Sequence, residues 1–187
     1  MAGADNQQER LDGYIAGYVD GEGSFSVVVN RNPSCRSGYQ LVPEFHVSQN
    51  GERAQVLTLI QRRLGGCGYI KRNGLRDKAL VLVVRKRDDL LNEVIPFFEA
   101  SPLLSSKHAE FEKFSMIVKA MAAGRHRSSA GFRELLELAV SMNGNGRYRR
   151  YQWLEVIGGQ PESSETVRQT GRCIRKIQSE LHGDMQS

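Results

Sequence analysis

The fold is decided by the stretch Ile15-Ala16-Gly17-Tyr18-Val19-Asp20-Gly21-Glu22-Gly23. It lies in an apolar run whose small residues recur at spacings of three and four and therefore share one helical face: Gly13, Ala16 and Gly17. Because glycine inside a helix costs about 1 kcal/mol relative to alanine, this face indicates that another backbone approaches it closely. We predict a helix over Leu11–Val19 that stops at Gly21 or Gly23.

Strands follow this helix, and helices follow the strands. The segments Ser24–Asn30 and Tyr39–Ser48 alternate apolar and polar residues, which predicts two strands with one face in the core. A second hairpin is predicted from Gly68–Asn73 and Ala79–Arg85, around Asn73-Gly74. Helical spacing is found in five further segments: Glu52–Leu64, Asp88–Phe98, Ser105–Ala122, Ser128–Met142 and Glu165–Leu181. The order predicts an α+β fold whose antiparallel sheet is covered on one face.

Length and composition describe an ordinary globular chain, with 187 residues of which 40% are hydrophobic and 25% charged. We predict a core domain over 1–125 and a helical extension over 126–187 that packs on the core. No apolar run reaches the roughly 18 residues of a membrane span, so a membrane partner is excluded. The polar N-terminus fits neither a secretory signal nor a transit peptide. The cysteines form no CxxC pair and indicate reduced thiols of an intracellular protein, in a prokaryotic cytoplasm or an organelle matrix: Cys35, Cys67 and Cys173.

The quoted stretch, together with Ser24-Phe25 behind it, resembles the signature of the LAGLIDADG homing endonucleases. The predicted order of elements also agrees with the αββαββα domain of that family. The resemblance covers about residues 11–120, and Ser163–Arg168 is similar to a stretch in the tail of single-motif chloroplast members. Single-motif members are homodimers whose signature helices pack side by side. The resemblance therefore implies a homodimer joined by the face of small residues: Gly13, Ala16 and Gly17.

Two acids at the end of the predicted helix are suited to metal chemistry. Phosphodiester hydrolysis needs charge neutralisation and an activated water, and a divalent metal supplies both. The resemblance implies that Glu22 and the Gly21 carbonyl bind Mg²⁺, which prefers oxygen ligands, and that Asp20 holds the helix end. It also implies that Mn²⁺ can substitute and that Ca²⁺ binds without supporting cleavage. Family members often have Asp where this chain has Glu22, so the longer side chain changes the metal geometry.

Three further polar residues match the surroundings of the family's active site. The resemblance implies that Gln49 orders the attacking water, that Arg53 faces the scissile phosphate and that Lys107 completes the basic shell. Taken singly, each is an ordinary surface residue, and a lone Asp-x-Glu merely ends a helix. Together with Glu22 they form a predicted catalytic set. The sequence shows neither a nucleophilic Ser or Cys beside a base nor the Cys/His spacing of a zinc site.

The predicted sheet is suited to reading DNA. A two-stranded ribbon fits the major groove, where alternate side chains reach base edges. The net charge of +5 and a basic run over residues 67–87 favour a polyanionic partner. We expect phosphate contacts from Arg72, Arg85 and Arg87. The side chains expected to contact DNA bases are Ser26, Val28, Asn30, Asn32, Arg36, Gln40, Glu44, His46, Tyr69, Lys71 and Asn73.

The function predicted from these features is site-specific, metal-dependent cleavage of both strands of a long, pseudo-palindromic DNA target by an intron-encoded enzyme. Two alternatives stay open. One is an RNA-binding maturase whose partner is intron RNA, and the other is a nuclease-dead DNA-binding regulator on the same fold. The predicted catalytic set favours cleavage, because a protein that only binds has no need of it.

Overall fold

The computed structural model describes residues 2–35, 37–74 and 78–142, with side chains from residue 6 onward. The chain divides into two units, 1–145 and 146–187, and every described residue belongs to the first. Arg36, Ser163–Arg168 and the helix predicted over Glu165–Leu181 lie outside the described residues. The predicted packing of an extension over 126–187 on a core over 1–125 stays a prediction.

The described elements begin with α1 (Ala2–Glu22), β1 (Gly23–Arg31), β2 (Tyr39–Asn50), a 3-10 turn η1 (Gly51–Arg53), α2 (Gln55–Arg63), β3 (Tyr69–Arg72) and β4 (Ala79–Val84). They continue with α3 (Arg87–Asp89), a π-helical turn η2 (Leu90–Val94), α4 (Ile95–Ala100), α5 (Lys107–Ala122), a 3-10 turn η3 (Arg125–Arg127) and α6 (Ser129–Ser141). The predicted α+β fold is confirmed. Within the described ranges, no helix is long and apolar enough to cross a membrane.

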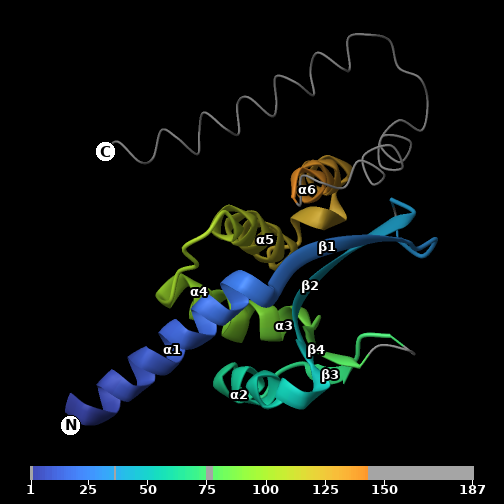
Figure 1. Cartoon of the computed structure of the whole chain (residues 1–187). Helices are drawn as coiled ribbons and strands as arrows, with labels where there is room; N and C mark the ends of the chain where they lie inside the picture. Colours follow the sequence, from blue (N-terminus) through green and yellow to red (C-terminus); the bar gives the residue numbers. More distant parts are fainter. Residues whose placement is uncertain (1, 36, 75–77, 143–187) are drawn as a thin grey trace. The chain divides into compact units, whose positions relative to one another are not determined.

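The four strands form one antiparallel sheet in the order β1-β2-β4-β3. The described helices lie on the same side of this sheet, and none of them covers its other face, here called the open face (Figure 1). The alternation sorts the side chains as predicted: Phe25 and Val27 of β1 and Phe45 and Val47 of β2 are buried on the helix side. The side chains at the alternate positions of both strands therefore point toward the open face.

The core is centred on a cluster of aromatic rings between the sheet and the helices. Phe25 stacks on Phe45 with ring centroids 5.2 Å apart. The edges of Phe98 and Phe111 meet the same ring at 5.4 and 5.3 Å. Offset and edge-on contacts of this kind are favoured by the ring quadrupole. The cluster joins β1 and β2 to α4 and α5, and it thereby fixes the strand that follows the signature stretch.

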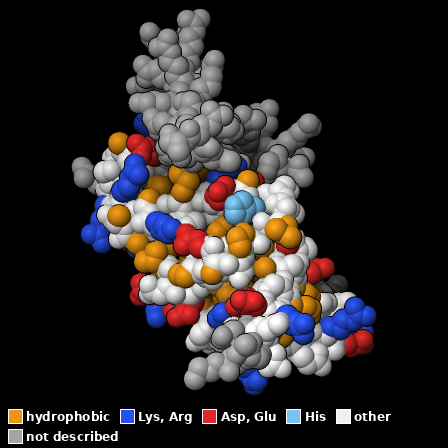
Figure 2. Space-filling view, turned by 90° about the vertical axis from the view of Figure 1, so that its left-hand side faces the viewer, with side chains coloured by type: hydrophobic (Ala, Val, Ile, Leu, Met, Phe, Trp, Pro, Cys, Tyr) orange, Lys and Arg blue, Asp and Glu red, His pale blue; other side chains and the backbone are white. Residues whose placement is uncertain are grey.

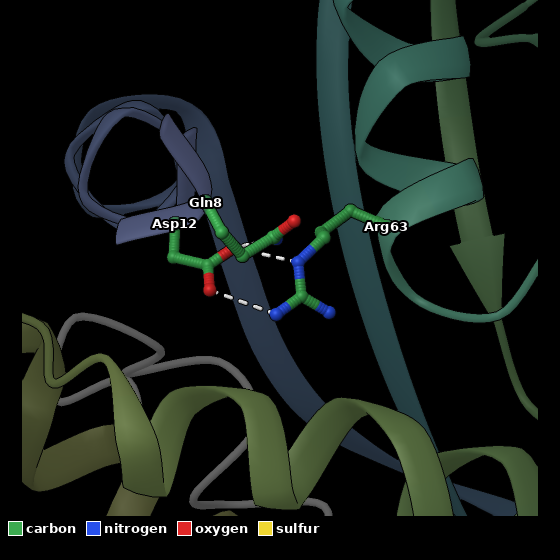
Figure 3. A network of polar contacts seen from close by, with 3 residues as sticks. All are labelled: Gln8, Asp12 and Arg63. Atoms are coloured by element: carbon green, nitrogen blue, oxygen red, sulfur yellow. Dashed lines mark hydrogen bonds and ion pairs between the residues drawn. The ribbon is translucent and has the colours of Figure 1, made fainter. Parts of the chain in front are cut away.

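Helix α1 is longer than the sequence predicts, since it begins at Ala2 rather than Leu11. Its first turns are polar and carry no apolar period for a pattern to detect. A tertiary contact ties this half of the helix down: both oxygens of Asp12 accept hydrogen bonds from Arg63 at the end of α2, at 2.6 and 2.8 Å (Figure 3). Gln8 adds a bond of 3.1 Å to the same carboxylate. The Arg63 bonds hold the pKa of Asp12 below its usual value.

Several other boundaries differ from the prediction by one to three residues, and three of these differences have a clear local cause. The helix predicted over Asp88–Phe98 is interrupted by the wide turn η2 (Leu90–Val94) just before Pro96. Proline has no N–H to donate and crowds the preceding turn, so a locally wider winding suits this position. The helix predicted from Glu52 begins at Gln55, because the preceding residues form η1. Helix α6 begins one residue later than predicted, because the Ser128 hydroxyl accepts a bond from the Gly131 N–H and caps it.

Candidate active site and nucleic-acid interface

The C-terminal end of α1 is joined to the segment before α5 by Asp20. Its carboxylate accepts hydrogen bonds from the N–H groups of Leu104 and Ser105, at 3.2 and 2.9 Å, and from the Ser105 hydroxyl at 2.5 Å. Partial burial alone would raise the pKa of Asp20, but these bonds and the nearby Lys107 lower it. These bonds attach the end of α1 to the segment before α5, and the role implied for Asp20 in holding the helix end stays a prediction.

Lys107 lies against the same helix end. Its Nζ donates to the carbonyl oxygens of Val19 and Gly23, at 3.0 and 2.6 Å. A helix C-terminus carries partial negative charge, so a cation there is stabilising. Desolvation lowers the pKa of Lys107, and the charges of Asp20 and Glu22 oppose that shift. The ammonium therefore lies beside the predicted metal ligand, with two of its donors engaged by backbone rather than free to face a phosphate.

Glu22 is the last residue of α1, and its side chain is exposed. Gly21 is exposed as well, and a Cβ built on it would meet no atom within 4 Å. The next residue is buried: a Cβ on Gly23 would lie 2.5 Å from Cγ1 and 2.7 Å from the carbonyl oxygen of Val19. Only glycine lets the chain turn this closely from helix into strand. The turn leaves one carboxylate and one carbonyl at an open surface.

Gln49 lies near the C-terminal end of β2, and Arg53 lies on η1, which follows that strand. Gln49 Nε2 donates a hydrogen bond of 2.6 Å to the hydroxyl of Tyr18, which comes from α1. Arg53 is exposed on η1, which is held by a 3.1 Å bond from the Gly51 N–H to the Lys78 carbonyl. The charges of Glu22 and Arg53 both act on the pKa of Tyr18. The structure thus brings Gln49, Arg53, Lys107 and Glu22 together at one end of α1.

The open face of the sheet carries most of the side chains predicted to read DNA. The register pairs Ser26 with Glu44, Val28 with Val42 and Asn30 with Gln40, so β1 and β2 supply one continuous surface. On β3 and β4, Tyr69 pairs with Val83 and Lys71 with Val81, on the same face. The Lys71 ammonium lies over the Tyr69 ring, 5.9 Å from its centroid. Asn32 donates a 3.1 Å bond to Gln40 near the end of the hairpin, and Asn73 is exposed at the β3–β4 turn.

Glu44 is predicted to contact DNA bases, but its side chain is not exposed. It is only 5% exposed, and each of its oxygens faces a cationic or basic partner. Oε1 lies 2.6 Å from Nε of Arg85, and Oε2 lies 3.0 Å from Nε2 of His46. Partial burial lowers the pKa of His46, against the attraction of Glu44. Arg85, expected at a phosphate, is therefore paired with a carboxylate on the sheet, and a base contact by Glu44 would require its partners to move.

The outer side of α1 borders a hollow of about 480 Å³. Gly13 and Gly17 line it, and both are exposed with open space where a Cβ would stand. Leu104, at the opposite rim, is 95% exposed. Ala16 also lines the hollow but is only 6% exposed, because its side chain is turned further toward the core of the same chain. From the side of the helices, hydrophobic side chains are visible between acidic and basic ones (Figure 2).

Two contributors to this site were missed from the sequence. Tyr18 lies inside the quoted stretch, and its position two residues before Asp20 could have suggested it. Ser105 could not have been found, since only the folded chain brings it to Asp20, 85 residues away. The signature helix thus ends in an exposed acid, beside a sheet whose one face is not covered by the described helices. Comparisons with known proteins bear on this arrangement.

A family model described as "LAGLIDADG endonuclease" matches residues 15–118, which is more than half of the chain. The chain belongs to this family. The span includes the signature stretch, the whole sheet and most of α5, so it contains every residue of the predicted catalytic set.

Solved LAGLIDADG structures share the fold. The chain is 38% identical to the homing endonuclease I-TnaI, with a TM-score of 0.71 over 77% of this chain and 95% of that one. It is 32% identical to the LAGLIDADG homing endonuclease I-LtrWI bound to target DNA, with a TM-score of 0.70 over 73% of this chain and 45% of that one.

A curated relative is "Probable intron-encoded endonuclease 2" of Neurospora crassa, 32% identical over 131 residues. The match covers 70% of this chain and 28% of the relative. The chain spans less than a third of the length of the first curated relatives it matches.

Proposed function

We propose that this chain is an intron-encoded, site-specific DNA endonuclease that cuts both strands of a long, pseudo-palindromic target. The observation that carries the proposal is the cluster at the end of α1. There an exposed carboxylate, Glu22, stands where α1 leads into β1, Lys107 is close enough to feel its charge, and both Glu22 and Arg53 act electrostatically on Tyr18. DNA supplies both the phosphate for such a cluster and the base edges for such a sheet.

The helix end fits a divalent cation, for which we propose Mg²⁺. Glu22 and the Gly21 carbonyl offer hard oxygen ligands at an exposed position. The partial negative charge of a helix C-terminus favours a cation at the same place. A bound divalent ion supplies charge neutralisation and a water of lowered pKa. We expect Mn²⁺ to replace it and Ca²⁺ to bind without supporting cleavage.

The remaining residues of the cluster act on the phosphate and the water. Gln49 is positioned to orient a water, because it is an amide held by two hydrogen bonds, one to Tyr18 and one from the Asn50 N–H. Arg53 is exposed and can neutralise charge on a phosphate. Lys107 stabilises the helix end through the carbonyls of Val19 and Gly23 and thereby fixes the place of Glu22.

We propose that the active form is a homodimer. Double-strand cleavage needs a site for each strand, and the described residues contain no group of three or more His, Cys, Asp or Glu side chains that could hold a metal. A second copy would supply the second carboxylate. Its α1 would pack where Gly13 and Gly17 are exposed and Leu104 lies uncovered, since small residues allow close approach of two helices.

The open face of the sheet would lie in the major groove, with the predicted side chains of β1, β2 and β3 toward the bases. Arg72 and Arg87 would contact phosphates at its rim. An enzyme with this substrate works where the DNA is, in a prokaryotic cytoplasm or an organelle matrix.

The proposal is tested with the full chain and a library of random duplexes. Duplexes retained by the protein are amplified and sequenced, and the most enriched one (the selected duplex) is incubated with protein and Mg²⁺. We expect enrichment of a long, pseudo-palindromic sequence and cuts at one fixed position on each strand. A protein that binds a selected duplex without cutting it supports the regulator instead. A protein that retains structured RNA and no duplex supports the maturase.

A further inference from the structure

Tyr18 is a polar side chain of the cluster with no role in the predicted catalytic set. It projects from α1 toward β2, where its hydroxyl meets Gln49 Nε2 at 2.6 Å. This hydrogen bond is partly buried and spans 31 residues of sequence. It joins the signature helix to the strand that carries the predicted water-orienting residue.

The orientation of the Gln49 amide follows from its other partner. The Asn50 N–H lies 2.7 Å from Gln49 Oε1, and a backbone N–H can only donate, so the atom facing it must be the amide oxygen. The amide nitrogen therefore faces Tyr18 and donates to it. The phenol oxygen is the acceptor, so the hydroxyl hydrogen of Tyr18 remains available. Among the described residues, the Tyr18 hydroxyl has no other hydrogen-bond partner.

The surroundings keep that hydrogen on Tyr18. Partial burial raises the pKa of the phenol, the Gln49 bond and Arg53 oppose this, and the charges of Glu22 and Tyr14 add to it. The pKa is above its usual value, so Tyr18 stays neutral at ordinary pH.

We propose that Tyr18 is a positioning residue for cleavage: its phenol oxygen accepts the hydrogen bond from Gln49 and thereby fixes the Gln49 amide in one orientation. This inference rests on the proposed endonuclease function. Without the bond to Tyr18, the amide keeps only its contact with the adjacent Asn50 N–H and can rotate. Loss of an outer partner that orients a catalytic group commonly costs about 10- to 100-fold in activity.

The test compares Tyr18→Phe with Tyr14→Phe. Tyr14 lies one turn earlier on α1, is 54% exposed, and its ring centroid is 6.2 Å from that of Tyr18. Both variants keep the ring and lose only a hydroxyl, so Tyr14→Phe is a matched control. On the selected duplex with Mg²⁺, we expect Tyr18→Phe to slow single-turnover cleavage about 10- to 100-fold with little change in Kd. Tyr14→Phe should cleave like the wild type.

Two further measurements separate positioning from a general structural effect. In a Gln49→Ala background, Tyr18→Phe should have almost no additional effect on the cleavage rate, because the two residues act as one unit. In NMR spectra, the side-chain amide of Gln49 should shift in Tyr18→Phe and not in Tyr14→Phe. Equal cleavage by wild type and Tyr18→Phe, or additive effects with Gln49→Ala, would overturn the inference alone. A wild-type protein that cuts no selected duplex would overturn the proposed function and this role with it.

Discussion

The end of α1 and the open face of the sheet use polar side chains in different ways. At the helix end, Asp20, Lys107 and Gln49 each take part in at least two hydrogen bonds, and each has at least one partner distant in sequence. On the sheet, Tyr69 and Lys71 are exposed and touch mainly each other. Reaction geometry needs groups held firmly in place, whereas base reading needs side chains that can reach out.

The exception on the sheet sharpens this contrast. Glu44 is buried between Arg85 and His46, and its ion pair with Arg85 has an N–O distance of 2.6 Å. This pair is a partnered group on a face where Tyr69 and Lys71 are exposed. Substitutions at the helix end should therefore change the cleavage rate, and substitutions on the sheet should change which sequences bind.

The largest effect is expected from the exposed face of α1. Gly17 has no atom within 4 Å of a built Cβ, so Gly17→Leu should leave the fold of a single chain intact. In a dimer, the leucine would force the helices apart and displace both sites, and a misplacement of 1 Å can cost about 100-fold in rate. Sedimentation and cleavage of the selected duplex measure both effects, with Thr58→Leu on the exposed face of α2 as the control. A dimeric Gly17→Leu protein with full activity would refute this interface.

The next effect separates base reading from cleavage. Lys71 is exposed on the open face and is expected to contact a base edge, so Lys71→Ala should alter the ranking of bound sequences. A good base contact discriminates by about 1–3 kcal/mol. Lys78→Ala, an exposed lysine just before β4, should weaken binding uniformly. Binding across the duplex library at several salt concentrations decides between them. If Lys71→Ala ranked the bound sequences as the wild type does, Lys71 would not contact a base.

A smaller effect is expected within the Glu44 network. Glu44→Ala leaves Arg85 without its carboxylate, and Arg85→Ala leaves a buried carboxylate without its cation. Because Arg85 is 44% exposed and water screens the pair, we expect each loss to cost about 1 kcal/mol of unfolding free energy. Urea unfolding of both single variants and the double variant measures the coupling. Additive losses would show that the pair does not act together.

The smallest effect concerns acid stability. The folded-state pKa of Asp12 is lowered, first by its bond to Arg63, and that of Asp20 is lowered as well. A carboxyl with a lowered pKa stabilises the fold above its unfolded pKa of about 4, and this contribution is lost as the pH falls further. Thermal unfolding between pH 6 and 3 should therefore show a smaller loss of stability for Asp12→Asn than for the wild type. Identical pH profiles would argue against the ion pair with Arg63.

Features of the fold that follow from a short repeat in the sequence, such as the alternation of side chains along a strand, can be predicted from the sequence. Alternation placed Ser26, Glu44 and His46 on one face, because a strand turns every second side chain the same way. It could not show that Glu44 is buried, since Arg85 belongs to a segment that only sheet pairing brings next to β2. The polar start of α1 was missed for a related reason: its order depends on a contact with Arg63 rather than on an apolar stripe.

The candidate active site shows the same limit: contacts between residues distant in the sequence cannot be predicted from a local pattern. The resemblance predicts roles for Glu22 and Asp20 at the end of the helix and for Gln49, Arg53 and Lys107 near it, and these roles stay predictions. The bonds from Lys107 to the carbonyls of Val19 and Gly23 cross more than 80 residues, and no local pattern encodes them. Chemistry and order along the chain can thus be predicted, but the atoms that hold each group in place require the folded structure.

We propose that the end of α1 carries out DNA cleavage and that the open face of the sheet recognises the DNA sequence. The most direct test measures binding and cleavage of the selected duplex by Glu22→Gln in the same Mg²⁺ samples, with Glu52→Gln, an exposed acid on η1, as the control. We expect Glu22→Gln to bind with a Kd close to that of the wild type and to cleave at least about 100-fold more slowly, since metal-derived charge stabilisation is worth several kcal/mol. Glu52→Gln should match the wild type. Wild-type cleavage by Glu22→Gln, or loss of binding together with cleavage, would contradict the account.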